Sequence, residues 1–319
     1  MKNYIFLCGV NCITIDEDLK NGFEFIPNTK NDEFPCIKIT NNKEKISEIL
    51  SKYNIRDFIG LIEYDYLYNN SNLIAYVEGE YDESQISPKD YLDKHLLLLQ
   101  MYFFSIWTVK DNAADFDMGY LIVKDGNDVS ATSNLLSVTN YTSKGTRESI
   151  NFSLKDLELA KKFLHENIEI EASFGNFANK QPHSRVTIAN YFIQHARSTH
   201  DIGFKIISYC SALETLFSNE ITELSHRLSE RIACFIASEK EDRKFYYKLI
   251  KNAYNIRSKV VHGATFKDQK LEEINSVVVE IDSLCRRLTI YSLETPKDNN
   301  VFYYENNSFD EYFIDLILS

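Results

Sequence analysis

An arginine and a histidine stand five residues apart in the segment YNIRSKVVHG, residues 254–263. A guanidinium can hold the non-bridging oxygens of a phosphate through two hydrogen bonds and can neutralise charge that grows in a transition state. An imidazole exchanges a proton near neutral pH, so it can move a proton to or from an RNA oxygen. Arg257 and His262 could therefore perform phosphoryl transfer without a metal. The ribose 2′-hydroxyl would be the nucleophile, leaving a 2′,3′-cyclic phosphate and a 5′-hydroxyl and sparing DNA.

The same segment is expected to end a helix, because Gly263 suits the left-handed backbone just past a helix C-terminus. His262 then lies in the last turn, where the helix dipole favours a positive charge. Five residues correspond to about 140° around a helix axis. The pair cannot share one narrow stripe, but both side chains can line a broad cleft.

The elements that position this pair are predicted from an apolar period of 3.6 residues, which runs from residue 184 to residue 293. Five helices with short connections are typical of an all-α bundle. Ser238 and Glu241 fit a capping box ahead of a helix over 245–262. The apolar stripes expected to be buried are Ile188, Tyr191, Phe192 and His195 in the first helix, Phe204, Ile207, Cys210, Leu213, Leu216 and Phe217 in the second, Leu224, Leu228, Ile232, Phe235 and Ile236 in the third, and Leu271, Ile274, Val278, Ile281, Cys285 and Leu288 in the last.

The first part of the chain mixes strands and helices. Strands are expected over residues 4–10, 59–68 and 73–81, with the last two forming a hairpin across Asn69 and Asn70, and a second hairpin is expected over 121–132 with its turn at 125–127. Ser87 followed by Pro88 and Asp90 predicts the start of a buried helix that runs to about Val109. Ser153 with Asp156 predicts another helix, through Leu164.

The chain is therefore expected to have an α+β fold. A mixed α/β domain over residues 1–180 is followed by a helical bundle over 181–295 and by an acidic, aromatic tail over 296–319. The polar stretch at 175–182 is the predicted boundary. The tail could dock on the body of the protein, or it could act as an acidic plug that mimics RNA phosphates.

Charge is distributed unevenly along the chain, which has 35 Lys+Arg, 47 Asp+Glu and a net charge of −12. Residues 1–150 hold 14 basic and 23 acidic side chains, whereas residues 181–292 hold 16 basic and 13 acidic ones. A protein that is acidic overall can still bind nucleic acid if its basic groups gather on one face. The balance permits an anion-binding helical half without establishing one.

Several classes of protein do not fit the sequence. The longest apolar run, residues 96–109, is too short to cross a bilayer, and the N-terminus lacks the features of a secretory signal. Six scattered cysteines favour reduced, buried thiols, so we expect a cytoplasmic protein without membrane contact. We expect no metal, because Cys8, Cys12 and Cys36 lack a fourth ligand at zinc-like spacing. We expect no cofactor, because no glycine-rich loop precedes a lysine.

Three segments resemble the signature stretches of the ApeA-like branch of the HEPN superfamily: SALETLF (211–217), ELSHRLSERIA (223–233) and YNIRSKVVHG. The resemblance covers residues 184–292. It implies a HEPN helical bundle that forms a homodimer. It also implies that Arg-x(4–6)-His motifs meet across the dimer interface to form a metal-independent endoribonuclease site.

The resemblance also implies roles for particular residues. Arg257 and His262 would be the catalytic pair, and Ser258 takes a supporting position where many relatives have Asn, Asp or His. Glu214 and Arg231 match charged positions of the flanking helices and are expected to pair near the site and orient Arg257. A purely structural buried pair is the alternative for these two residues.

ApeA-like proteins are associated with abortive-infection defence against phage, in which RNA cleavage halts the infected cell. The resemblance implies that residues 1–180 sense a phage-derived trigger, and it leaves open whether the enzyme is active without one. Two alternatives remain: an inactive HEPN module that binds RNA, a nucleotide or a protein partner, and a HEPN toxin held by a separate antitoxin. A toxin would be lethal when expressed alone, whereas a triggered defence protein would be tolerated until infection.

Overall fold

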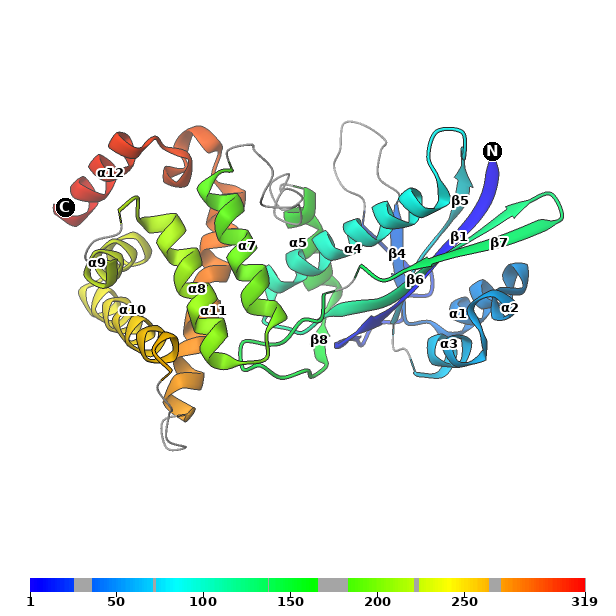
Figure 1. Cartoon of the computed structure of the whole chain (residues 1–319), viewed down its shortest axis with the longest axis horizontal. Helices are drawn as coiled ribbons and strands as arrows, with labels where there is room; N and C mark the ends of the chain where they lie inside the picture. The colour runs from blue at the N-terminus through cyan, green and yellow to red at the C-terminus, as the bar shows by residue number, and fades with distance from the viewer. Residues whose placement is uncertain are drawn as a thin grey trace. The chain divides into compact units, whose positions relative to one another are not determined.

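The structure, a computed structural model, describes residues 1–25, 36–70, 73–136, 138–165, 183–220, 224–263 and 271–318 (Figure 1). The chain forms two compact units, of which the first comprises Met1–Asn140 and Arg147–Glu166 and the second comprises Tyr141–Thr146 and Asn167–Ser319. The segment Tyr141–Thr146 belongs to the helical unit because, for example, the N–H of Tyr141 donates to the carbonyl of Arg197 at 2.8 Å. The predicted boundary at 175–182 lies outside the described residues.

The first unit is built around a six-stranded antiparallel sheet in the order β3-β4-β5-β1-β6-β7. Its strands are β1 (Lys2–Asn11), β3 (Phe23–Phe25), β4 (Ile37–Thr40), β5 (Leu73–Tyr81), β6 (Asp115–Asp125) and β7 (Asp128–Asn134). A parallel pair joins β2 (Ile13–Ile15) to β8 (Ile150–Phe152). Strand β1 is almost entirely apolar because side chains on both of its faces are buried.

Helices pack on both faces of this sheet. Phe6 of β1 stacks on His95 of helix α4 (Pro88–Val109), with ring centroids 4.7 Å apart. Burial lowers the pKa of His95 to about 4, so it serves as a neutral core residue. The next residues on β1, Ile5 and Leu7, join a cluster on the opposite face with Ile46 and other residues of α1 (Lys43–Leu50).

Several local predictions are confirmed. The Ser87 side chain caps α4 by accepting the N–H of Asp90, and the helix runs to Val109. Strands β6 and β7 form the predicted hairpin, with Gly126 at φ +60° in its turn. Helix α5 (Leu154–His165) begins after Ser153, which exchanges hydrogen bonds with Asp156. Within the part of the chain that the structure describes, no helix has the length and apolar character that a membrane span requires.

The predicted strand over residues 59–68, and with it the hairpin across Asn69 and Asn70, is wrong. This segment is helical: α2 (Ile55–Ile59), α3 (Leu61–Asp65) and a π-helical turn, η2 (Tyr66–Asn70). Strand β5 pairs with β4 on one side and β1 on the other, so it offers no free edge to a further strand. Aromatic and β-branched residues favour strands only where a sheet surface receives them.

The second unit is helical, and the chain has an α+β fold with a helical C-terminal region. Its helices are α7 (Arg185–Ser198), α8 (Ile202–Phe217), α9 (Leu224–Ile236), α10 (Lys240–Val261), α11 (Leu271–Glu294) and α12 (Asn306–Leu318). The stripe predicted for the last bundle helix is confirmed in α11 at Ile274, Val278, Ile281, Cys285 and Leu288, which are buried, but not at Leu271, which is 43% exposed at the start of the helix. All six cysteines are free, and Cys8, Cys210 and Cys285 are buried.

Other details of the helical prediction are wrong. Phe204, in the stripe predicted for the second helix, is 56% exposed at the start of α8. Helix α7 buries Val186, Ala189 and Ile193 instead of the predicted stripe, of which Tyr191 is 39% exposed. The helix has apolar residues on two faces, and packing selects the face with smaller side chains. Helix α10 begins at Lys240 after Glu239, without a side-chain cap, so Ser238 and Glu241 do not form the expected box.

The tail docks on the helical unit. Phe309 and Phe313 of α12 are fully buried, and Asp310 forms an ion pair with Arg231 of α9 at 2.7 Å. In Figure 1, α12 and the C-terminal end of α10 lie at different ends of this unit. Of the two alternatives for the tail, the structure therefore shows docking on the helical unit. The Asp310 carboxylate pairs with Arg231 and does not lie near His262.

Candidate active site

Helix α10 ends as predicted, with Gly263 in the left-handed region at φ +71°. The N–H of His262 donates to the carbonyl of Ser258 at 3.1 Å, and the N–H of Gly263 donates to that of Val260 at 3.0 Å. These bonds satisfy carbonyls at the helix end. The residues Ser258 and His262 are both exposed, so the imidazole is open to a ligand.

The guanidinium of Arg257 is held by two groups. Its Nη2 lies 3.3 Å from Oε1 of Glu214 on α8, and the Tyr254 hydroxyl donates to the same oxygen at 2.6 Å. The guanidinium carbon also lies 5.5 Å from the centroid of the Tyr254 ring. About 31% of the Arg257 side chain remains exposed. The group is therefore oriented and still accessible.

Burial sets the protonation of the neighbours of this arginine. It raises the pKa of Tyr254, and the hydrogen bond to Glu214 raises it further, so the phenol stays a donor. Burial also raises the pKa of the Cys210 thiol, which stays neutral beside Arg257. Among the described residues the buried Nε of Arg257 has no hydrogen-bond partner.

Antiparallel packing of α8 and α10 brings these side chains together. Gly203, at the start of α8, lies against Val260, and a Cβ there would be 3.0 Å from a valine methyl carbon. Helix side chains lean toward the N-terminus of their own helix, so Glu214 and Arg257 lean toward each other. Close approach at Gly203 thus supports an ion pair further along the two helices.

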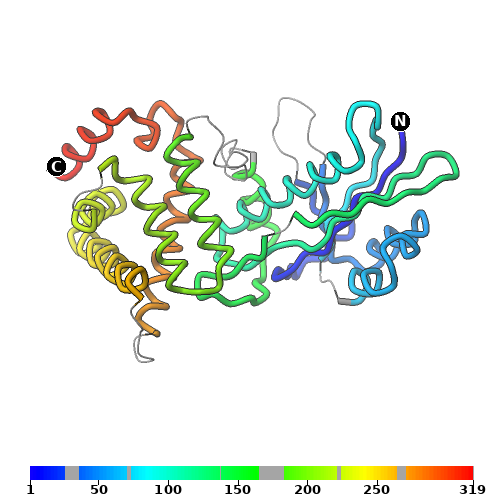
Figure 2. The backbone as a smooth tube through the Cα atoms, viewed as in Figure 1, coloured from blue at the N-terminus to red at the C-terminus, as the bar shows by residue number. Residues whose placement is uncertain are grey.

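An exposed apolar surface adjoins the end of α10. Phe204, Val261 and Leu271 are 56%, 59% and 43% exposed. They stand at the start of α8, the end of α10 and the start of α11, which lie at the same end of the helical unit (Figure 2). We refer to these three residues as the apolar end patch. Exposed apolar patches of this kind favour contact with another protein surface.

The expected pairing of Glu214 with Arg231 is wrong. Arg231 donates to Asp310 of α12 at 2.7 Å and to the carbonyl of Phe217 at 3.0 Å. The carboxylate that this arginine uses belongs to Asp310 of the tail helix, and no local pattern in the sequence indicates that pairing. The structure therefore brings Glu214, but not Arg231, to Arg257.

Within the described residues, no hydrogen bond or ion pair joins the side chains of Arg257 and His262. Their separation of about 140° around α10 directs them to different sides of the helix. Arg257 lies toward the packed side, against Glu214, and His262 lies at the exposed end. Within one protomer the two groups face different directions. An arginine and a histidine can contact one phosphate if a second copy of the chain packs against the C-terminal end of α10.

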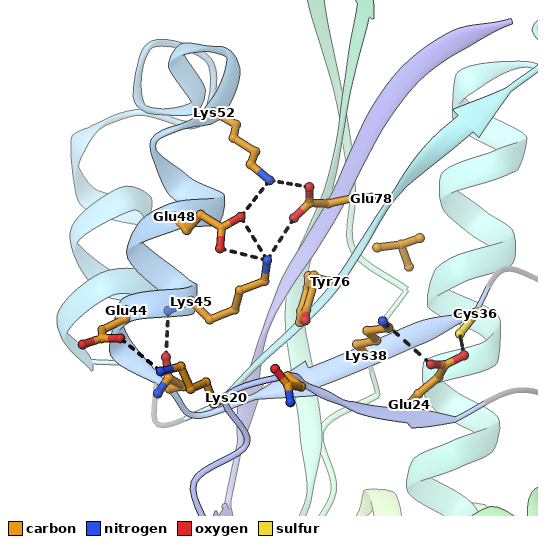
Figure 3. A pocket seen from close by; sticks show the side chains of 13 residues that line it. Lys20, Glu24, Cys36, Lys38, Glu44, Lys45, Glu48, Lys52, Tyr76 and Glu78 are labelled. Atoms are coloured by element: carbon orange, nitrogen blue, oxygen red, sulfur yellow. Dashed lines mark hydrogen bonds and ion pairs between the residues drawn. The ribbon is translucent and has the colours of Figure 1, made fainter.

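A second polar region is a cavity of about 790 Å³ in the first unit, beneath α1 (Figure 3). Its charged lining residues are Lys20, Lys38, Lys45, Lys52, Glu24, Glu44, Glu48 and Glu78. Lys45 and Lys52 each contact both Glu48 and Glu78, at distances between 2.5 and 3.7 Å. This ring of alternating charges is neutral, so the cavity has no preference for an anion.

Comparison with family models, with curated proteins and with solved structures found no match for this chain. In the described ranges, no group of three or more His, Cys, Asp or Glu side chains is arranged to hold a metal ion.

Proposed function

We propose that this chain is a metal-independent endoribonuclease of the HEPN type that acts as a homodimer. The observation that carries the proposal is the guanidinium of Arg257, oriented by Glu214 and Tyr254 on a helix that ends at the exposed His262. The resemblance of residues 184–292 to ApeA-like HEPN domains supports the same activity.

In the proposed reaction, Arg257 binds the non-bridging oxygens of one RNA phosphate. His262 takes the proton of the ribose 2′-hydroxyl while its oxygen attacks phosphorus and the bond to the 5′-oxygen breaks. Water gives a proton to the leaving 5′-oxygen, and the imidazolium of His262 then returns its proton to the solvent. The products are a 2′,3′-cyclic phosphate and a 5′-hydroxyl. Ser258 would contact the substrate only as a neutral hydroxyl.

Two features support a dimeric site. The apolar end patch lies beside His262 and would be buried by a second copy. Arg257 and His262 face different sides of α10, so a facing α10 can supply the group that each phosphate lacks.

We also propose a role in abortive-infection defence in the cytoplasm, with the first unit sensing a phage-derived trigger. The competing candidate is a HEPN module that binds RNA without cutting it. The lack of a contact between Arg257 and His262 in one protomer favours that competitor. A binding module would retain RNA affinity and produce no new ends.

The test is cleavage of a 5′-labelled RNA in excess EDTA by the wild type and by His262→Ala. The full chain is required, because a fragment that begins at residue 181 would lack the segment Tyr141–Thr146 of the helical unit. Cleavage by the wild type alone is expected. Equal cleavage by both proteins, or cleavage of the matching DNA, would contradict the proposal.

A further inference from the structure

The exposed face of α10 carries a row of lysines. Lys240, Lys244, Lys248, Lys251 and Lys259 are all exposed, and we refer to them as the lysine row. Their spacing places them within an arc of about 100° around the helix, and His262 falls within the same arc. The buried residues of α10, such as Ile250 and Ala253, lie on the opposite side. At 1.5 Å per residue the row extends over about 28 Å, and His262 follows about 5 Å beyond Lys259.

Beyond the first turn of α10, which holds Glu241 and Asp242, this helix carries no further carboxylate beside the lysine row. Among the described residues, only Lys244 has a carboxylate partner, Glu241, at 2.6 Å. Like charges four residues apart repel each other on a helix, so such a row weakens the helix that carries it. A cluster of one sign on a chain with a net charge of −12 is typical of a surface that binds a polyanion.

A hollow of about 450 Å³ adjoins the row at Lys251. Leu224, Ser225 and His226 of α9 form the rest of its lining. The Tyr247 ring is half-buried nearby: it lies 5.3 Å from the Lys251 ammonium and 6.0 Å from the His226 ring. Cationic tracks with aromatic platforms are how proteins bind single-stranded nucleic acid, since unpaired bases can stack on the rings.

We propose that the lysine row binds the phosphate backbone of single-stranded RNA and leads it to His262, with one unpaired base in the hollow at Lys251. The choice of RNA rests on the proposed function, but binding itself requires no cleavage. A hollow lined by the His226 imidazole, with the Tyr247 ring nearby, favours a single strand, because bases in a duplex are stacked on each other and cannot enter it.

The test measures binding of a 5′-fluorescent, 2′-O-methyl RNA of about 20 nucleotides to the full-length protein by anisotropy at several salt concentrations. The 2′-O-methyl groups prevent cleavage, so binding is measured separately from catalysis. In Lys244→Gln/Lys248→Gln/Lys251→Gln, affinity should fall about tenfold or more near 0.1 M salt. The slope of log K against log salt should become shallower by about 2, since each lost phosphate contact removes about 0.7 for a single strand.

A matched control removes the same charge elsewhere. Lys89→Gln/Lys144→Gln/Lys155→Gln changes three exposed lysines outside α10 and should bind RNA within about twofold of the wild type. Tyr247→Leu should lower affinity about fivefold or more with the salt slope unchanged, because stacking does not release counterions. Thermal unfolding of each variant verifies that it is folded.

The outcomes separate this inference from the proposed function. Wild-type affinity and salt slope in the folded lysine-row variant, or an equal loss in the control, would overturn the inference. If the wild type binds through the row but never cuts RNA, the inference stands and the proposed function fails. If it cuts RNA and the row variant binds normally, the proposed function stands and the inference fails.

Discussion

Lysines gather in two places in this chain, and their surroundings differ. In the cavity of the first unit, Lys45 and Lys52 share the carboxylates of Glu48 and Glu78. In the lysine row of α10, one described lysine of five has a carboxylate partner. Lysines in ion pairs stabilise local structure, whereas lysines without a carboxylate partner make the electrostatic potential of a surface positive. The net charge of a chain therefore says little about what any one surface binds.

Two arginines of the helical unit differ in the same way. The side chain of Arg231 is 8% exposed and is used by Asp310 and a backbone carbonyl. The side chain of Arg257 is 31% exposed and is held by Glu214 from one side. We expect the first arginine to stabilise the fold and the second to act on a ligand.

The largest effect should come from the proposed catalytic pair. Arg257→Ala and His262→Ala should each lower the rate of RNA cleavage about 10²–10⁴-fold, because each removes a group that acts in the transition state. Lys45→Gln in the cavity should leave the rate within about twofold. A cavity variant as inactive as His262→Ala would break the distinction between the two regions.

Mixing Arg257→Ala with His262→Ala tests whether each site takes its arginine and its histidine from different protomers. After protomer exchange, about half of the dimers contain one Arg257→Ala and one His262→Ala chain. Such dimers keep one of the two equivalent arginine–histidine pairs on facing helices, so activity should return, up to about a quarter of the wild-type rate. Exchange without any recovery would place both groups of a site in one protomer.

Arg231, like the paired lysines of the cavity, should contribute to the stability of the fold and not to RNA cleavage. Arg231→Met removes the donor of the Phe217 carbonyl and one of two donors of Asp310, the other being Asn219, and should lower the free energy of unfolding by about 1–3 kcal/mol, measured by urea denaturation. Cleavage per folded molecule should not change. As a control, Arg227→Met removes an exposed pair with Glu220 and should cost less than about 1 kcal/mol. Lost cleavage at unchanged stability would assign Arg231 to the site.

Tyr254 should act as a positioning residue. Tyr254→Phe keeps the ring and removes the hydroxyl that donates to Glu214, so Arg257 becomes less ordered. We expect kcat to fall about fivefold with KM nearly unchanged, equivalent to one lost hydrogen bond of about 1 kcal/mol. Because the pKa of Tyr254 is raised, its titration should not enter the pH profile of the wild type. An unchanged kcat would limit the hydroxyl to packing.

The smallest effect concerns the cavity itself. Hydrogen bonds from Lys45 and then Lys52 lower the pKa of Glu48. The ion pairs of Glu48 with these lysines therefore stabilise the fold at pH values above the ordinary pKa of a glutamate. That stabilisation is lost as the pH falls through the lowered pKa of Glu48. Lys52→Met should move the Glu48 titration, followed by carbon NMR, back toward the ordinary value without changing RNA binding. An unmoved titration would show that the ring is not formed in solution.

Local signals in the sequence predicted much of the fold. Capping at Ser87, the turn at Gly126 and the helix end at Gly263 depend on residues close together in the chain, and all three are confirmed. The segment 59–68 was predicted wrongly because a strand needs a free sheet edge, and the sheet order decides where edges are free. The face that α7 buries depends likewise on its packing partners.

The candidate site was predictable in part. The motif locates Arg257 and His262 at the end of a helix, because both lie within one short segment. The contact of Glu214 with Arg257 spans 43 residues of chain, and only the resemblance suggested it. The pairing of Arg231 with Asp310 depends on where the tail helix docks, which no local signal encodes. The lysine row is visible in the sequence as a helical spacing, which the total charge of residues 181–292 does not reveal.

The most direct test of the central claim identifies the ends of the RNA products formed in excess EDTA. Mass spectrometry should find a 2′,3′-cyclic phosphate and a 5′-hydroxyl at each cut made by the wild type, and no cuts made by His262→Ala. Products with a 5′-phosphate and a 3′-hydroxyl, or cuts that persist in His262→Ala, would contradict the account.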